Sequence, residues 1–238
     1  MGGGVGLSVH GRLRIAGDGT MFAMPETGIG YFPDVGGTYF LPRLGMDIGQ
    51  WLGLTGARLD AGQTYGVGVA NAYVPSVQHG ALIKALGKAK LDASDSAVAN
   101  VLMDFVKSPP QSEPIPEAVK AFGAKTVPAI LRELDKDGSE WAQKQAKNIR
   151  RKSPLAMSVT FEAIRRGSKK NFREVMAQEL DISLNFLKTQ DFYEGIRAQL
   201  IDKDRNPKWS HEDVNVVTEP QVQRLFRKIA KPPQEFLA

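Results

Sequence analysis

Residues 25–37, PETGIGYFPDVGG, place two carboxylates, Glu26 and Asp34, in a segment that is otherwise mostly apolar or built of glycine and proline. An unpaired carboxylate among apolar neighbours is costly, so it persists where it is paired, hydrogen-bonded or chemically useful. Two neighbouring acids also push their pKa values apart, which suits one of them to remain a base. The alternative interpretation is that both acids cap turns beside the glycines.

A glycine-rich run, GGGVGLSVHG, occupies residues 2–11. Glycines at the start of a helix allow the backbone to approach a ligand closely, and the first N–H groups of the helix are unsatisfied donors. Such donors can stabilise the oxyanion that develops in acyl transfer, and Gly3 and Gly4 would lie nearest the helix start. Close packing of the backbone is the other explanation for these glycines.

The composition excludes several classes of function. The 238 residues are 42% hydrophobic and 24% charged, and Lys plus Arg exceed Asp plus Glu by 31 to 26. The basic residues concentrate at 148–154 and 164–173, which we interpret as solvated helix faces. No RNA-binding signature accompanies them, and no apolar run approaches the roughly 20 residues that span a bilayer. We therefore expect neither a nucleic-acid partner nor a membrane partner.

The sequence also argues against a metal site. It contains no cysteine, so thiolate ligands, disulfides and thiol nucleophiles are absent. The histidines, His10, His79 and His211, are widely separated and lack metal-ligand spacing. Residues 202–213, DKDRNPKWSHED, imitate a calcium loop but have Pro207 where the sharp turn needs glycine.

The chain divides into a mixed part and a helical part. We expect an α/β piece over residues 1–75, in which Asp60 and Gln63 predict a capping box at a helix start. A helical region is expected over 76–238, with a proline-rich linker at 107–117. The predicted β-type runs are RLRIAG (12–17), MFAMPE (21–26) and NAYVP (71–75). The predicted helices cover GMDIGQWLGLTG (45–56), DAGQTYGVG (60–68), two helices in 128–154 joined by a turn at Asp137-Gly138, SPLAMSVTFEAIRRGS (153–168), NFREVMAQELDISLNFLKTQ (171–190), DFYEGIRAQLIDKD (191–204) and PQVQRLFRKIAKP (220–232).

Several of these segments together resemble the crotonase (enoyl-CoA hydratase/isomerase) superfamily. The similarity is weaker over about 76–140. The segments that support it are MGGGVGLSVHG (1–11), FAMPETGIGYFPDVGGTYFLPRL (22–44), LTGARLDAGQTYGVGVANAYV (54–74), KSPLAMSVTFEAIRRGS (152–168) and DFYEGIRAQLIDKDRNPKW (191–209). The acid-bearing stretch is most similar to the hydrolase members, which act on short branched 3-hydroxyacyl-CoA thioesters such as 3-hydroxyisobutyryl-CoA.

Two positions favour hydrolysis over hydration within this resemblance. Hydratases of the superfamily place a catalytic glutamate where this chain has Gly6, and a glycine is typical where it has Asp34. Glu26 matches a catalytic glutamate in both subfamilies. The resemblance implies that Glu26 activates water or attacks the thioester itself, and that Asp34 orients the 3-hydroxyl group or assists proton transfer. Which acid performs which step is left open.

The resemblance further implies a partial crotonase β-β-α spiral followed by helices that cover the acyl-CoA site or mediate assembly. The thioester oxygen would bind the Gly3 backbone, with Gly4 beside it, and Lys203 could approach a CoA phosphate. An exposed Lys203 paired with Asp202 or Asp204 is the alternative. Phe192, Ile196 and Leu200 are expected to share a buried helix face.

The expected partners follow from the same resemblance. We expect no cofactor beyond the coenzyme A of the substrate, assembly into a homo-oligomer, and a cytoplasmic location, or the mitochondrial matrix in a eukaryote. Roughly half of the spiral precedes the glycine-rich helix in this superfamily, so we expect a complementary N-terminal half or chain. The alternatives are an enoyl-CoA hydratase/isomerase and a non-catalytic crotonase-derived binding or assembly module.

Overall fold

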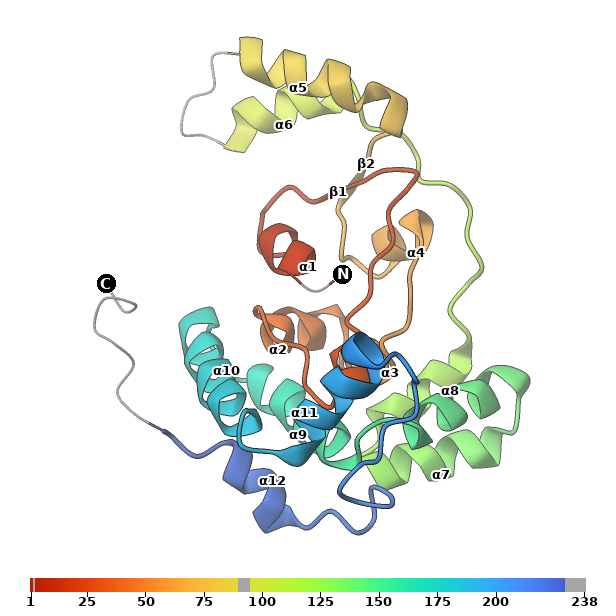
Figure 1. Ribbon diagram of the computed structural model, residues 1–238. Helices are drawn as coiled ribbons and strands as arrows, with labels where there is room; N and C mark the ends of the chain where they lie inside the picture. The colour runs from red at the N-terminus through yellow and green to blue at the C-terminus, as the bar shows by residue number, and fades with distance from the viewer. Residues whose placement is uncertain (2, 90–94, 230–238) are drawn as a thin grey trace. The chain divides into compact units, whose positions relative to one another are not determined.

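The computed structural model describes residues 1, 3–89 and 95–229, which form two compact units (Figure 1). Unit 1 contains Met1, Gly3–Ala23 and Arg58–Ile115. Unit 2 contains Met24–Ala57 and the described residues from Pro116 onward. These boundaries differ from the division that we expected after residue 75, and the assignment of residues 1–75 to a spiral core stays a prediction.

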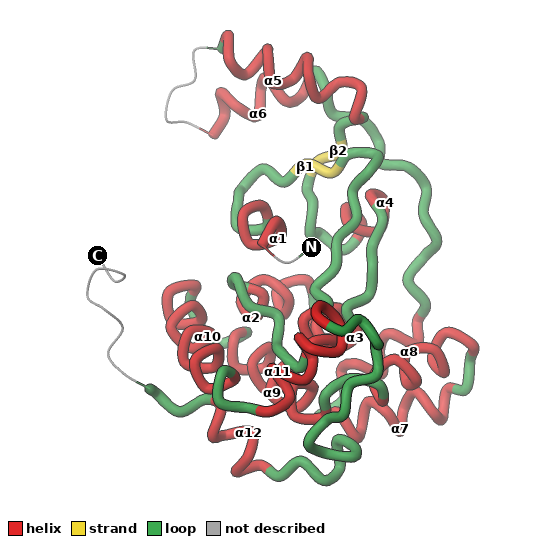
Figure 2. The backbone as a smooth tube through the Cα atoms, in the orientation of Figure 1, coloured by secondary structure: helices red, strands yellow, loops and turns green. Residues whose placement is uncertain are grey.

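Unit 1 contains the strands of the described chain, β1 and β2, which Figure 2 draws in yellow. They pair in parallel, with Ile15 opposite Ala72 and Ala16 opposite Tyr73. Two of the three predicted β-type runs therefore form strands, whereas the third contributes one antiparallel bridge between Phe22 and Leu59. The elements of unit 1 are α1 (Gly3–Ser8), β1 (Ile15–Ala16), α4 (Ala61–Gly66), β2 (Ala72–Tyr73), η3 (Ser76–Gln78), α5 (His79–Lys88) and α6 (Asp95–Met103).

Local signals explain the elements of unit 1. The capping box at the start of α4 is confirmed, because the Asp60 carboxylate accepts from the Gln63 backbone at 2.9 Å and the Gln63 side chain accepts in return. Tyr73 of β2 packs with Ala16 and with Ala61 of α4. Leu82 of α5 lies in a second apolar cluster with Ala72, Val74 and Leu102.

Unit 2 is helical in its described residues. The turn predicted at Asp137-Gly138 is confirmed: α7 ends at Asp137, Gly138 adopts a φ of 66°, and Ser139 caps α8. Ser153 caps α9 through the Ala156 backbone. The elements of unit 2 are η1 (Glu26–Ile29), α2 (Gly37–Phe40), η2 (Leu41–Leu44), α3 (Met46–Thr55), η4 (Glu117–Gly123), α7 (Val127–Asp137), α8 (Glu140–Arg150), α9 (Pro154–Gly167), α10 (Phe172–Phe186), α11 (Gln190–Ile196), the π-helical turn η5 (Arg197–Ile201) and α12 (Glu219–Leu225).

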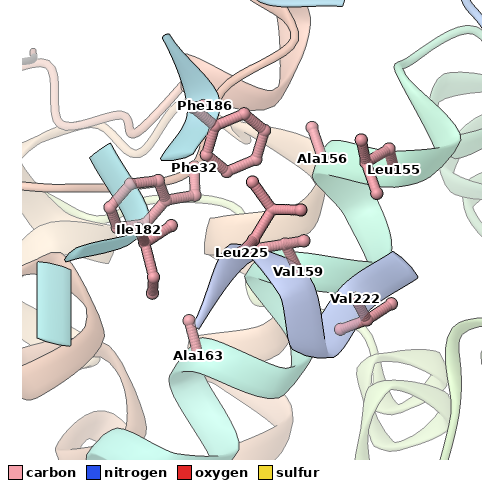
Figure 3. Close-up of a cluster of buried hydrophobic side chains, with 9 residues drawn as sticks. All are labelled: Phe32, Leu155, Ala156, Val159, Ala163, Ile182, Phe186, Val222 and Leu225. Carbon is pink, nitrogen blue, oxygen red and sulfur yellow. The ribbon is translucent and has the colours of Figure 1, made fainter. Parts of the chain in front are cut away.

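The largest apolar side chains of one core cluster of unit 2 are the rings of Phe32 and Phe186, which stack with centroids 5.8 Å apart (Figure 3). The cluster joins the segment between η1 and α2 to α9, α10 and α12. Its buried members are Phe32, Leu155, Ala156, Val159, Ala163, Ile182, Phe186, Val222 and Leu225. The segment that contains both candidate acids is therefore anchored on a packed helical base.

The expectation that Phe192, Ile196 and Leu200 share a buried helix face is wrong in part. Phe192 and Ile196 are half-buried, but Leu200 is 59% exposed. The segment Arg197–Ile201 is a π-helical turn, so the regular α-helical spacing on which the expectation depended does not continue through Leu200. Gly195 and Ala198 provide the close packing instead.

Candidate active site

Glu26 begins the short 3-10 helix η1, which is fixed to α3 because the Thr27 hydroxyl donates to the Leu54 carbonyl at 3.0 Å. The Glu26 side chain is 9% exposed. Its Oε2 is buried and has no hydrogen-bond partner within the part of the chain that the structure describes. A buried carboxyl oxygen without a partner is rare in folded proteins, and it is free to bond with a ligand or water.

Burial raises the pKa of Glu26 from 4.5 to about 7. The Glu26 backbone N–H opposes this shift, the negative charge of Asp34 adds to it, and the positive charge of Lys152 opposes it. A carboxyl with a pKa near neutrality can both accept and release a proton at the pH of most cells. The charge of Asp34 thus acts on Glu26, as expected of neighbouring acids, and the roles of both acids stay predictions.

Asp34 lies in a tight turn that leads into α2. Its carbonyl accepts from the Gly37 backbone at 2.7 Å, and the next residues, Val35 and Gly36, have positive φ angles of 51° and 80°. The left-handed conformation is unfavourable for a β-branched residue such as Val35. Burial also raises the pKa of Asp34, which is half-buried. Strained backbone beside a half-buried acid is a frequent feature of functional sites.

Glu179 of α10 holds this turn in place. Its carboxylate accepts from the backbone N–H of Gly36 at 2.8 Å, the backbone N–H of Thr38 at 2.9 Å and the Thr38 hydroxyl at 2.7 Å. It thereby caps the N-terminus of α2, where Gly36 offers no side chain of its own. Burial raises the pKa of Glu179 to about 7, the hydrogen bonds from Thr38 and Gly36 oppose that shift, and Asp34 adds to it.

Sequence reasoning missed Glu179, although a signal was present. The buried face of α10 contains Val175, Ile182 and Phe186, and Glu179 lies at helical spacing among them. An acid on the apolar face of an amphipathic helix indicates a specific partner, because an unpaired buried charge is costly.

Lys152 was also missed, because we interpreted the basic stretch 148–154 as a solvated face. Arg150 and Arg151 are exposed as expected, but Lys152 is partly buried. Its Nζ lies 3.6 Å from the position that a Cβ on Gly28 of η1 would occupy. Burial lowers the pKa of Lys152 to about 8, and the charge of Glu26 opposes that shift.

Gly3 and Gly4 begin α1 in unit 1, so the predicted helix start is confirmed. Within the described chain, a Cβ added to either glycine would meet no atom within 4 Å. The role of their N–H groups as oxyanion donors stays a prediction.

Lys203 is exposed and has a positive φ of 58°. The alternative pairing that we considered is wrong, because Asp202 and Asp204 both pair with Arg197, at 2.7 and 2.6 Å. Contact between Lys203 and a CoA phosphate stays a prediction. Within the described residues, no helix combines the length and apolar character needed to cross a bilayer.

Comparison with known proteins adds independent information about this arrangement. The family model for enoyl-CoA hydratase/isomerase matches residues 1–226. The chain is 40% identical over 244 residues to the human mitochondrial 3-hydroxyisobutyryl-CoA hydrolase, covering 99% of this chain and 63% of that protein. It is 43% identical to the zebrafish (Danio rerio) protein of the same name, covering 96% and 62%.

Solved structures agree with the fold. A carnitinyl-CoA dehydratase from Mycobacterium thermoresistibile matches with a TM-score of 0.86 and 34% identity, over 97% of this chain and 66% of that one. An enoyl-CoA hydratase from Rhodobacter sphaeroides matches with a TM-score of 0.79 and 38% identity, over 95% and 65%. The fold is thus α/β, part of a crotonase spiral followed by a helical region, as the sequence predicted.

The chain spans less than two thirds of the length of the human and zebrafish relatives. Over that span, the family model covers most of the sequence, and it includes both candidate acids. The chain therefore belongs to the enoyl-CoA hydratase/isomerase family.

Proposed function

We propose that this chain contributes the catalytic acids of a thioester hydrolase that acts on short branched 3-hydroxyacyl-CoA, such as 3-hydroxyisobutyryl-CoA. The observation on which the proposal rests is the buried Glu26 carboxyl, whose Oε2 lacks a partner within the described chain and whose pKa is raised in part by the charge of Asp34. The names of the human and zebrafish relatives support the same reaction.

Hydrolysis requires a new bond from a water oxygen to the acyl carbon and cleavage of the carbon–sulfur bond. Glu26 takes the proton of the attacking water, or attacks the carbonyl carbon itself to give an anhydride that water then opens. Asp34 orients the 3-hydroxyl group of the substrate or assists proton transfer to the departing thiolate. The products are the free 3-hydroxy acid and coenzyme A, and no further cofactor is needed.

The carbonyl oxygen becomes negatively charged as water adds. The backbone N–H groups at the start of α1, at Gly3 and Gly4, are the donors that we propose for this oxyanion. Lys203 is the proposed contact for a phosphate of coenzyme A, since it is exposed and is not part of the Arg197 ion pairs.

Enoyl-CoA hydration is the second candidate, because the Rhodobacter sphaeroides neighbour is named as an enoyl-CoA hydratase. Gly6 disfavours this reaction, since hydration needs a second acid to deliver or take a proton and glycine has no side chain. The decisive test compares release of free thiol from 3-hydroxyisobutyryl-CoA with hydration of crotonyl-CoA. The assay should use the chain alone and the chain joined to the N-terminal segment expected from the family. Hydration that exceeds thiol release would contradict the proposal.

The remaining expectations depend on this function. We propose that the protein assembles into a homo-oligomer. We propose that it works in the mitochondrial matrix of a eukaryote or in the cytoplasm of a bacterium; the human and zebrafish relatives are named as mitochondrial proteins.

A further inference from the structure

Lys152 is held between two helices by its immediate neighbours. It follows the end of α8 at Arg150 and precedes Ser153, the fully buried cap of α9. The Ser153 hydroxyl donates to the Asp191 carboxylate at 2.5 Å and accepts from the Ala156 backbone at 3.0 Å. The backbone beside Lys152 is therefore fixed by a buried hydrogen bond to α11.

The same Asp191 carboxylate also fixes the segment around Trp209. Its second oxygen accepts from the Ser210 backbone at 2.8 Å, and the Trp209 indole N–H donates to the Arg151 carbonyl at 3.0 Å. The Trp209 ring lies 3.1 Å from the position of a Cβ on Gly30, at the end of η1. We call this arrangement of Ser153, Asp191 and Ser210 the Asp191 bridge.

The Lys152 side chain extends over η1, the helix that begins with Glu26. Its Nζ lies 3.6 Å from the Cβ position of Gly28, two residues after Glu26. Within the described chain the Lys152 ammonium forms no hydrogen bond or ion pair, and the Glu26 Oε2 also lacks a partner. The partly buried Lys152 ammonium thus lies beside the short helix that begins with Glu26, whose buried Oε2 lacks a partner.

The other ionisable groups around Glu26 in unit 2 do not supply a positive charge. Asp34 is acidic and opposes ionisation of Glu26, and Glu179 is acidic and bound to Gly36 and Thr38. The Tyr31 phenol donates to Ser183 at 2.6 Å, and its pKa is raised to about 12 by burial, so it stays neutral. Among the described groups of unit 2, Lys152 is the cation whose charge lowers the pKa of Glu26, and Glu26 in turn raises the pKa of Lys152.

We propose that Lys152 is a positioning residue for the hydrolysis: its ammonium group, fixed over η1 by the Asp191 bridge, favours the ionised form of Glu26, which accepts the proton. The inference rests on the proposed function, and it assigns a role to a residue that the resemblance did not mark. A nearby opposite charge favours the ionised form of a carboxyl, so the charge of Lys152 lowers the pKa of Glu26 against the effect of burial.

The test is the replacement Lys152→Met, which keeps the length of the side chain and removes its charge. We expect the acidic limb of the pH profile of kcat/KM for thiol release to move up by about one pH unit. At pH values on the acidic side of the limb, kcat/KM should fall approximately tenfold, and at higher pH it should change little. Lys152→Arg, which retains the charge, should restore the position of the limb. Lys147→Met, at an exposed position on α8, is the matched control and should leave the profile unchanged.

A second measurement does not depend on activity. The carbon-13 signal of the Glu26 carboxyl, assigned by difference against Glu26→Gln, reports its titration directly. An unchanged Glu26 pKa in a folded Lys152→Met protein would overturn the inference, and Lys152→Gln serves if the methionine variant does not fold. The two proposals can also fail separately. If the wild-type protein hydrolyses no thioester but the Lys152→Met variant has a higher Glu26 pKa than the wild type, the hydrolase function is contradicted and the effect of Lys152 on Glu26 is supported.

Discussion

Glu26 and Asp34 owe their raised pKa values chiefly to burial. Phe32, between the two acids, is fully buried against α9 and α10, and this packing withdraws the neighbouring carboxyls from water. Desolvation favours the neutral form of an acid, so the pKa of each carboxyl rises towards the range where proton transfer is useful. We therefore expect the reaction to be sensitive to replacement of either carboxyl.

Replacing Glu26 by Gln should remove most of the thioester hydrolysis while the fold persists. The amide has nearly the same shape but cannot accept a proton from water, so we expect a loss of about 10²- to 10⁴-fold in kcat. The measurement is thiol release, with circular dichroism as the check of folding. Asp34→Asn should lower the rate on 3-hydroxyacyl thioesters as well. Glu133→Gln, on the exposed face of α7, is the control. Near-normal rates in both acid variants would mean that the chemistry lies elsewhere.

The resemblance predicted Glu26 and Asp34 as site residues because both lie in one continuous motif, and their roles stay predictions. It could not identify Glu179 or Lys152, which reach the same region from distant parts of the sequence. Gly36 and Glu179 are separated by 143 residues. Local patterns report which face of a helix is apolar, but they do not report which loop an acid on that face will cap. These partners emerge only from tertiary packing.

At the scale of elements, α2 depends on a capping group from another helix. Glu179→Gln leaves one carbonyl oxygen where two carboxylate oxygens accepted three hydrogen bonds, and the new NH₂ group faces a donor. We expect a loss of about 1–3 kcal/mol in the free energy of unfolding. Urea unfolding measures it, with Glu133→Gln as an exposed control. Stability equal to that of the wild type would show that the cap contributes little.

The contact between α11 and η1 gives a second element-scale prediction. A Cβ on Gly195 would lie 2.2 Å from the Ile29 carbonyl oxygen, so Gly195→Ala must separate the two helices. We expect a cost of about 1–3 kcal/mol and a slower reaction, because η1 contains Glu26. Gly123→Ala in the same unit is the control, since no atom lies within 4 Å of its added Cβ. Equal unfolding midpoints for the two variants would argue against a tight contact.

Most helices could be predicted from their local signals, whereas their exact extent could not. The Asp60–Gln63 capping box, the turn at Gly138 and the Ser153 cap lie within a few residues of the helices that they start or end. The π-helical turn at Arg197–Ile201 has no such signal. It coincides with the three ion pairs of Arg197 to Glu194, Asp202 and Asp204, which connect residues on either side of the turn.

For the whole molecule, the buried acids predict an unusual dependence of stability on pH. The pKa values of Glu26 and Glu179 rise from 4.5 to about 7, so between these values the native state holds more protons than the unfolded state. The free energy of unfolding should therefore fall as the pH rises from about 4.5 to 7. Lys152 acts in the opposite sense at higher pH: its pKa falls from 10.5 to about 8, so its contribution to stability rises with pH between those values.

Urea unfolding at a series of pH values between 5 and 8 tests this expectation. The double variant Glu26→Gln, Glu179→Gln should show a flatter profile between pH 5 and 7, because it lacks both titrating groups. Carboxyls with lowered pKa values, such as Glu162, lose their stabilising effect only as the pH falls through their folded-state pKa, below this window. A wild-type protein whose stability rises between pH 5 and 7 would contradict the assignment.

The division of the chain into units has a consequence for how the protein is made. Residues Met24–Ala57, which belong to unit 2, leave the ribosome long before the α10 carboxylate that caps their turn. At typical rates of about 5–20 residues per second, the 143 residues between Gly36 and Glu179 take roughly 7–30 s to synthesise. During that interval the nascent segment that contains Glu26 and Asp34 cannot pack against α10, because that helix has not yet been synthesised. The turn that contains Asp34 therefore gains its cap only after α10 has been synthesised, and chaperones that bind nascent chains have time to act on it.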